Sequence, residues 1–180
     1  MSALHRCAAL APALMLAACA SVERQDYPAD WPPLVPAAAG CPVLSGSYAN
    51  RGQGTQALAA WVIEGSALAL APVEQVQFDG PASGGLDIRL LDRQGRLLAA
   101  RRWQEGTQYR CADGMLVLNR DSGFAMVGVA MSMQARLART VHGSLVVESR
   151  ESGGGVVIVV PYLGSYRDWS LYPAVTPAAP

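Results

Sequence analysis

The sequence contains no lysine, so all 14 basic residues are arginine, and 14 acidic residues balance them. A chain with no net charge exerts no long-range attraction on nucleic acid, and we therefore expect no nucleic-acid partner. Charged residues are also scarce, at 16% of the chain, whereas hydrophobic residues make up 51%. This composition excludes a disordered or highly solvated protein and indicates a folded core.

Long hydrophobic runs are absent as well. A helix that crosses a bilayer needs about 20 consecutive apolar residues. The apolar run from Cys7 to Leu16 has only about 10, which is the usual length for the core of a secretory signal. It follows the positive charge of Arg6, as in a secretory signal peptide. We therefore expect the N-terminus to be removed from the mature protein.

Four residues at the end of this run point to lipidation. Leu16, Ala17, Ala18 and Cys19 stand in an order that resembles the lipobox of bacterial lipoproteins. The resemblance implies cleavage before Cys19, which leaves residues 1–18 as the signal peptide, and acylation of the cysteine thiol and of the new N-terminus. A thiol readily forms a nucleophilic thiolate, and two or more acyl chains anchor stably where one does not. The alternative is an ordinary secretory peptide with an incidental cysteine.

The cellular location of the mature protein is implied by the same resemblance. Ala20, and not Asp, comes after the lipidated cysteine, and by the sorting rule of enteric bacteria this implies the outer membrane, facing the periplasm. We interpret residues 19–40 as a semi-stiff tether between the membrane and the domain. Prolines at four positions exclude a helix or a central strand there: Pro28, Pro32, Pro33 and Pro36.

The cysteines of the folded part predict a disulfide. Cys7 would be removed with the signal peptide and Cys19 would be lipidated, which leaves Cys41 and Cys111. Two thiols in an oxidising envelope usually pair. A bridge that closes a loop of about 70 residues stabilises by about 4 kcal/mol in the chain-entropy model, less any strain. The competing interpretation, a metal or redox pair, lacks both a C-x-x-C motif and a second histidine.

The residues after the tether predict a single, mainly β domain at 41–175, followed by a disordered tail at 176–180. From Val73 onward, apolar and polar residues alternate and turn residues recur at spacings of about 8–12. This pattern is typical of an antiparallel β-sandwich or a partly open β-barrel. One short helix is expected within residues 57–62, because the apolar residues there suit one or two helical turns, and Gly65 is placed to end it.

Turn residues divide the predicted strands. Asp113-Gly114 is a strong signal for a tight hairpin. His142-Gly143 separates a long alternating segment, Phe124 to Val141, from the strand that follows. We interpret Gly153 to Gly155 as a further turn, because a phosphate-binding loop would need a helix after it and a β-branched segment follows instead.

Candidate catalytic and metal-binding residues are few. After processing, His142 is the only histidine, and no G-x-S-x-G nucleophile motif accompanies it. The sequence has no H-x-x-x-H pair and no cluster of cysteine and histidine, and its acidic residues are scattered singly. We therefore expect no catalytic residue, no metal site and no cofactor, and we interpret His142 as a solvated turn residue.

The arginines are the remaining candidates for binding. Six of them fall on strands that we expect to be neighbours, where they would present a basic face to an anionic lipid or a sugar phosphate: Arg101, Arg102, Arg110, Arg120, Arg136 and Arg139. The alternative is an ordinary solvated face, because a protein without lysine uses arginine for its polar surface.

These features together predict a membrane-anchored envelope lipoprotein that binds or scaffolds and does not catalyse. Its expected partners are the membrane, through the lipid anchor, and another envelope protein, a lipid or a glycan. One alternative is a carrier of a hydrophobic or lipid-like ligand within the β fold. Gly46-Ser47-Tyr48 bears on that alternative through a three-residue resemblance to the lipocalin Gly-x-Trp signature. A second alternative is an envelope hydrolase, which would need His142 beside a serine and an aspartate.

Overall fold

The structure is a computed structural model that describes these residues: 19–36, 40–54, 56–63, 70–82, 85–120, 129–157 and 160–176. They form ten strands in two sheets and one short helix, which confirms the predicted mainly β, sandwich-like fold. The expected signal peptide at 1–18 and the last four residues of the expected tail lie outside the described part.

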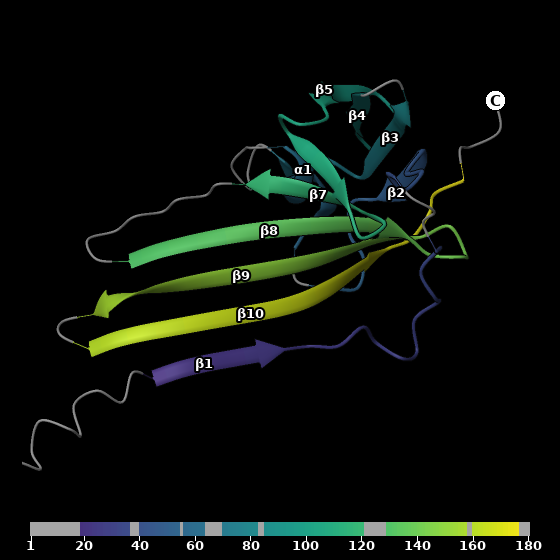
Figure 1. Cartoon of the computed structure of the whole chain (residues 1–180). Helices are drawn as coiled ribbons and strands as arrows, with labels where there is room; N and C mark the ends of the chain where they lie inside the picture. The colour runs from purple at the N-terminus through teal and green to yellow at the C-terminus, as the bar shows by residue number, and fades with distance from the viewer. Residues whose placement is uncertain are drawn as a thin grey trace, which may run out of the picture.

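The larger sheet has six strands in the order β1-β10-β9-β8-β7-β6 (Figure 1). Their bounds are β1 (Cys19–Arg24), β6 (Tyr109–Ala112), β7 (Met115–Arg120), β8 (Val129–Arg139), β9 (Leu145–Val157) and β10 (Val160–Tyr172). All neighbours are antiparallel except β1, which runs parallel to β10. The long strands β8, β9 and β10, with β1 beside them, extend beyond the rest of the domain as an arm (Figure 1).

The smaller sheet has four antiparallel strands in the order β2-β3-β4-β5. Their bounds are β2 (Gly46–Ala49), β3 (Gln75–Ala82), β4 (Gly85–Leu91) and β5 (Leu97–Gln104). One apolar core joins the two sheets. Leu86 and Ile88 of β4 are buried at alternate positions and cluster with Leu116 and Leu137 of the larger sheet, as the alternation in the sequence predicted.

The helix α1 (Leu58–Val62) lies where the sequence predicted it. A five-residue helix is not stable alone, so tertiary contacts must hold it. The Asn50 side chain accepts a hydrogen bond from the Ala59 N–H (2.7 Å) and donates one to the Val73 carbonyl (2.8 Å). From the helix itself, the Trp61 indole N–H donates to the Tyr172 hydroxyl across 3.0 Å, which ties the helix to the larger sheet.

Cys41 and Cys111 form the predicted disulfide, with their Cα atoms 5.0 Å apart. This separation lies within the range that a disulfide spans. Cys41 precedes β2 of the smaller sheet and Cys111 belongs to β6 of the larger one. The bond therefore links the start of one sheet to the edge of the other.

The described part of residues 19–40, which we interpreted as a tether, is bonded to the larger sheet. Residues 19–24 form β1, because the first proline comes only at Pro28 and the preceding residues are free to pair with the edge of β10. The residues that follow also stay on the sheet: the Val35 N–H donates to the Arg139 carbonyl across 2.8 Å. We call residues 25–36 the strap.

Aromatic side chains hold the strap against β10. The Tyr27 ring meets the Trp169 ring edge-on, with centroids 5.1 Å apart. The Trp169 indole N–H donates to the Gln25 carbonyl across 3.0 Å. Proline-rich backbone forms few hydrogen bonds of its own, so contacts of this kind supply the interactions that keep the strap in place.

The predicted turn at Gly153 to Gly155 is also wrong, because β9 continues through it. None of the three glycines has a positive φ, and Gly154 pairs with Ala130 on one side and with Leu163 on the other. Two ladders of backbone hydrogen bonds thus hold an extended conformation that the glycines alone would not favour.

The other two turns are confirmed. Asp113 and Gly114 both have positive φ, 53° and 72°, as a type I′ hairpin requires. His142 and Gly143 lie in the turn between β8 and β9. The long strand expected at 124–141 is β8 in the described part, and residues 121–128 lie outside it.

Candidate functional site

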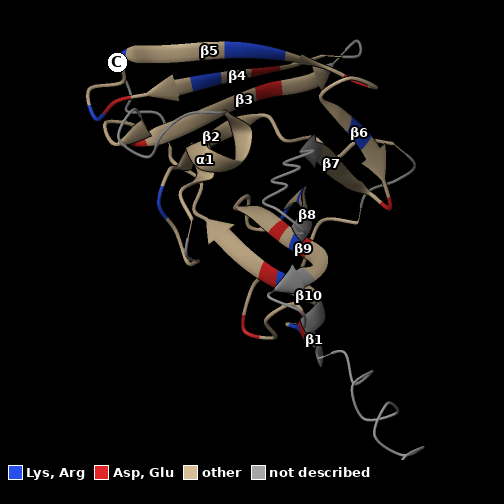
Figure 2. Ribbon diagram, turned by 90° about the vertical axis from the view of Figure 1, so that its left-hand side faces the viewer, with Lys and Arg blue, Asp and Glu red and all other residues tan. Residues whose placement is uncertain are grey.

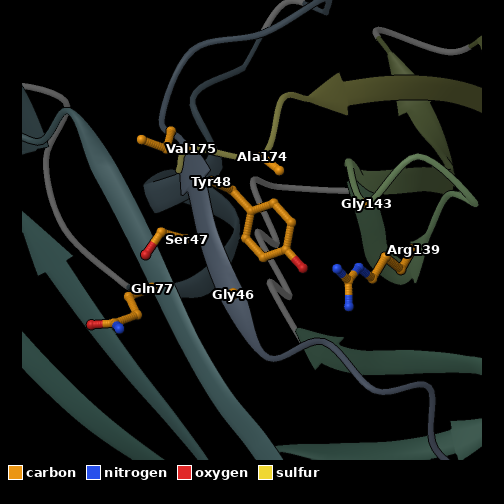
Figure 3. A pocket seen from close by; sticks show the side chains of 8 residues that line it. All are labelled: Gly46, Ser47, Tyr48, Gln77, Arg139, Gly143, Ala174 and Val175. Atoms are coloured by element: carbon orange, nitrogen blue, oxygen red, sulfur yellow. The ribbon is translucent and has the colours of Figure 1, made fainter. Parts of the chain in front are cut away.

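A cavity of about 250 Å³ lies where β2, the turn after β8 and the C-terminal segment meet (Figure 3). Eight residues line it: Gly46, Ser47, Tyr48, Gln77, Arg139, Gly143, Ala174 and Val175. The Val175 N–H donates to the Ser47 carbonyl (2.8 Å) and the Ala49 N–H to the Pro173 carbonyl (2.9 Å). These bonds hold the C-terminal segment beside β2. Because the lining combines residues of both sheets with this segment, the cavity forms only in the folded domain.

Gly46 and Gly143 have no side chains, and this leaves room in the cavity for the side chains of Tyr48 and Arg139. A Cβ atom at Gly46 would come within 3.3 Å of the Tyr48 hydroxyl, and one at Gly143 within 3.3 Å of an Arg139 guanidinium nitrogen. Both glycines also have positive φ, which other residues rarely adopt. A larger residue at either position would therefore displace Tyr48 or Arg139.

Tyr48 lines the cavity opposite Arg139 (Figure 3). Its side chain is buried, and the hydroxyl donates to the Leu44 carbonyl across 2.9 Å. Burial raises the pKa of Tyr48, and the nearby charge of Arg139 lowers it by a smaller amount. The phenol therefore stays neutral at physiological pH, and its one proton is already donated to the Leu44 carbonyl.

Arg139 supplies the positive charge. Its guanidinium points toward Tyr48, whereas Ser47 and Gln77 lie on the other side of β2 (Figure 3). No acidic side chain in the described part of the chain forms an ion pair with Arg139. A guanidinium that is free of such an ion pair suits a carboxylate or phosphate oxygen as its partner. Because typical small-molecule sites have about 300–1,000 Å³, this smaller cavity suits one charged group of a larger partner.

A second polar cluster lies on the face of the larger sheet that points away from the core. Glu148 is 1% exposed and forms ion pairs with three arginines, at distances of 3.1 Å to Arg136, 2.8 Å to Arg150 and 3.1 Å to Arg167. Arg136 also pairs with Asp113 at 3.0 Å. The charges of this cluster are largely satisfied within it, so we assign it a structural role.

The predicted basic face does not form, because the chain crosses from the smaller to the larger sheet between β5 and β6. Arg101 and Arg102 lie on β5 of the smaller sheet, where both line a shallow hollow of about 300 Å³. Arg102 is paired there with Asp87 at 3.4 Å. From their order in the sequence we expected β5 and β6 to be neighbours, but β5 belongs to the smaller sheet and β6 to the larger one.

The remaining arginines of that prediction are separated as well. Arg110 lies on β6, away from the basic residues of β5 (Figure 2). Arg136 is held in the Glu148 cluster, and Arg139 lines the cavity at the end of β8. The side chain of Arg120 lies outside the described part. Of the predicted basic residues, Arg139 alone lines the cavity beside Tyr48.

His142 and the cysteines show no arrangement for catalysis or metal binding in the described residues. His142 is exposed in its turn, as predicted. The one group of three potential metal ligands found among those residues is Cys41, Glu105 and Cys111. Its two sulfur atoms are joined to each other in the disulfide, so they are not available as thiolate ligands.

Comparisons with known proteins give no further guide to the site. No protein-family model, no curated protein and no solved structure matches this chain. Among the described residues, no helix is long and apolar enough to cross a membrane.

Neither the cavity nor the Glu148 cluster was predicted from the sequence. A signal for the cluster was present, since Glu148 interrupts the apolar segment Leu145 to Ser149 and Arg150 follows two positions later, on the same face of a strand. The cavity had no local signal, because its lining comes from four segments that are distant in the sequence.

Proposed function

We propose that this chain is a lipid-anchored protein of the bacterial envelope that acts by binding a partner and not by catalysis. The observation that carries the proposal is the order Leu16-Ala17-Ala18-Cys19 after a short apolar run, which resembles a lipobox. By the same resemblance, Ala20 favours the outer membrane, on its periplasmic side.

The cavity around Arg139 is the binding element that the geometry supports best. It combines a guanidinium that forms no ion pair within the described residues with space for one charged group beside it. The ligand class is therefore a carboxylate or phosphate carried by an envelope protein, a lipid headgroup or a glycan. The lining contains Ser47 as its one hydroxyl nucleophile apart from the phenol, and no histidine to activate it.

A carrier of a hydrophobic ligand would need free volume between the sheets. Large side chains occupy that space in the described structure, among them Tyr48, Phe78 and Leu118, each at most 1% exposed. Protein interiors of this kind are close-packed. Binding at the surface cavity is therefore favoured over transport within the fold.

Metabolic labelling with a fatty-acid analogue tests the anchor. Cys19→Ala removes the thiol that acylation needs, so we expect complete loss of label and release of the protein from the membrane fraction. Cys7→Ala is the matched control, because it removes a cysteine from the same apolar run but leaves the lipobox intact, and it keeps both properties. Label that persists in Cys19→Ala, or a wild-type protein without label, would overturn the proposal.

A further inference from the structure

The far end of the arm, where β1 begins, carries no charge. The sequence has no charged residue between Glu151 and Arg167, and β1 has none before Glu23. Glu23 and Glu151 both pair with Tyr166, so they mark one row across the sheet. From that row to the last pair, Val157 with Val160, the strands run for about 20 Å at a rise of about 3.3 Å per residue.

We call this uncharged region the arm end. It consists of residues 19–22 of β1, 129–132 of β8, 152–157 of β9 and 160–165 of β10. Two large hydrophobic side chains are exposed on it, Val22 at 63% and Leu163 at 60%. Val22 pairs with Ser165 and Leu163 pairs with Ala20, so these two side chains are diagonal neighbours on one face of the sheet. These two side chains form a small apolar patch between the charged row and the tip of the arm, and an exposed apolar patch marks a surface for contact with an apolar partner.

The parallel pairing of β1 with β10 brings Cys19 to this same end. Cys19 pairs with Tyr162, and β9 and β10 continue for two more residues, to the pair of Val157 and Val160. The strands therefore project about 7 Å beyond the anchor residue. Acyl chains on Cys19 would hold this projection at the bilayer surface, where apolar protein segments enter the interface by about 5–10 Å.

We infer that the arm end is a membrane-contacting surface that enters the lipid interface beside the anchor and sets the orientation of the domain. This inference rests on the proposed lipidation of Cys19. Its occupant is a lipid bilayer, because Leu163 pairs with Ala20, the residue next to the cysteine that would carry the acyl chains. The row of Glu23 and Glu151 limits the depth of insertion, since burying these carboxylates in lipid is costly.

The orientation has a consequence for the cavity. Arg139 stands at the opposite end of β8 from Val129, ten residues away, which corresponds to about 33 Å along the strand. A sheet that stands on its arm end therefore presents the cavity well away from the bilayer, toward the periplasm. Such a placement favours a carboxylate or phosphate of a soluble or neighbouring envelope partner over a headgroup of the same membrane.

Depth-dependent fluorescence quenching tests the arm end. The lipidated protein, carrying Leu163→Cys and an environment-sensitive fluorophore, is reconstituted into vesicles of phosphatidylethanolamine and phosphatidylglycerol with nitroxide-labelled lipid. Leu97→Cys is the matched control, because Leu97 is also a leucine on a strand, 58% exposed, but lies on β5 of the smaller sheet. We expect quenching at position 163 to be at least about twofold stronger than at position 97, since only position 163 enters the interface.

A second probe, Val22→Cys, lies two residues farther from the tip of the arm than Leu163, so we expect its quenching to fall between those at positions 163 and 97. Flotation with the vesicles and mass spectrometry of the attached lipid are measured on the same samples. Equal quenching at positions 163 and 97 in protein that carries lipid and floats would overturn this inference and leave the anchor intact. Protein without attached lipid would instead overturn the proposed function, and the inference with it.

Discussion

One carboxylate organises the outer face of the larger sheet. Glu148 is 1% exposed, and guanidinium groups from β8, β9 and β10 reach it. A buried carboxylate is costly by several kcal/mol unless ion pairs and hydrogen bonds compensate for the lost water. The three arginines supply that compensation, and without Glu148 they would repel one another.

Substitution of Glu148 should therefore destabilise the fold. Glu148→Gln keeps the size of the side chain and removes its charge, and we expect the free energy of unfolding to fall by about 2–4 kcal/mol. The value lies below that of a fully buried pair because Arg150 and Arg167 are partly exposed. Urea denaturation measures the change.

Asp113→Asn is the control, since it also removes a carboxylate that pairs with Arg136. The Asp113 side chain is 85% exposed, and exposed ion pairs contribute less than about 1 kcal/mol. Equal, small effects of the two substitutions would show that the Glu148 cluster contributes no more than an ordinary surface ion pair.

At the scale of elements, β1 and the strap attach the N-terminal part of the described chain to the larger sheet. Parallel pairing with β10 protects one edge of the larger sheet, where unpaired N–H and C=O groups would otherwise invite pairing with another chain. The strap then crosses the sheet and is bonded to the residues at the end of β8, through Val35 and Arg139. An anchor on Cys19 would thus be coupled directly to the sheet and not through a flexible linker.

Hydrogen–deuterium exchange distinguishes a paired β1 from a free tether. We expect alternate amides of residues 20–24, those that face β10, to exchange at least about tenfold more slowly than in an unstructured peptide, because an edge strand is hydrogen-bonded on one side only. Trp169→Ala removes the ring contact with Tyr27 and the hydrogen bond to Gln25. It should speed exchange in the strap and leave β4 unchanged, whereas unstructured rates for β1 in the wild-type protein would contradict the pairing.

β9 shows how neighbours override local preference. Gly153 to Gly155 predict a turn when considered alone, yet they lie in the middle of a strand with partners on both sides. The same preference is decisive at Asp113-Gly114, where the chain joins two adjacent strands and no third strand holds the residues extended. Glycine is present in both segments, so the number of neighbouring strands, and not composition, decides whether the segment is extended or forms a turn.

For the whole molecule, the disulfide is the one covalent link between distant parts of the described chain. Its cysteines are separated by 70 residues, and a loop of that length is predicted to stabilise by about 4 kcal/mol. We expect the double variant Cys41→Ala, Cys111→Ala to lose about 2–4 kcal/mol of unfolding free energy, measured by urea denaturation. Chemical reduction of the wild-type protein should produce a loss of the same size, and unchanged stability in both experiments would contradict this role.

The sequence by itself determined the features that depend on local patterns or on counting. Alternation of apolar and polar residues specified the mainly β class, Asp113-Gly114 and His142-Gly143 specified two turns, and the pairing of Cys41 with Cys111 followed because no other cysteine was left for the folded part. These features need no knowledge of which strands become neighbours.

Only the tertiary structure decided the rest. The attachment of β1 to β10, the separation of Arg101 from Arg139, and the cavity at Tyr48 all depend on which strands share a sheet. Sheet partners are chosen by packing and hydrogen bonding over the whole domain, between segments that lie up to about 140 residues apart in β1 and β10. No local stretch of sequence contains that choice, because each strand has an edge that several others are able to pair with.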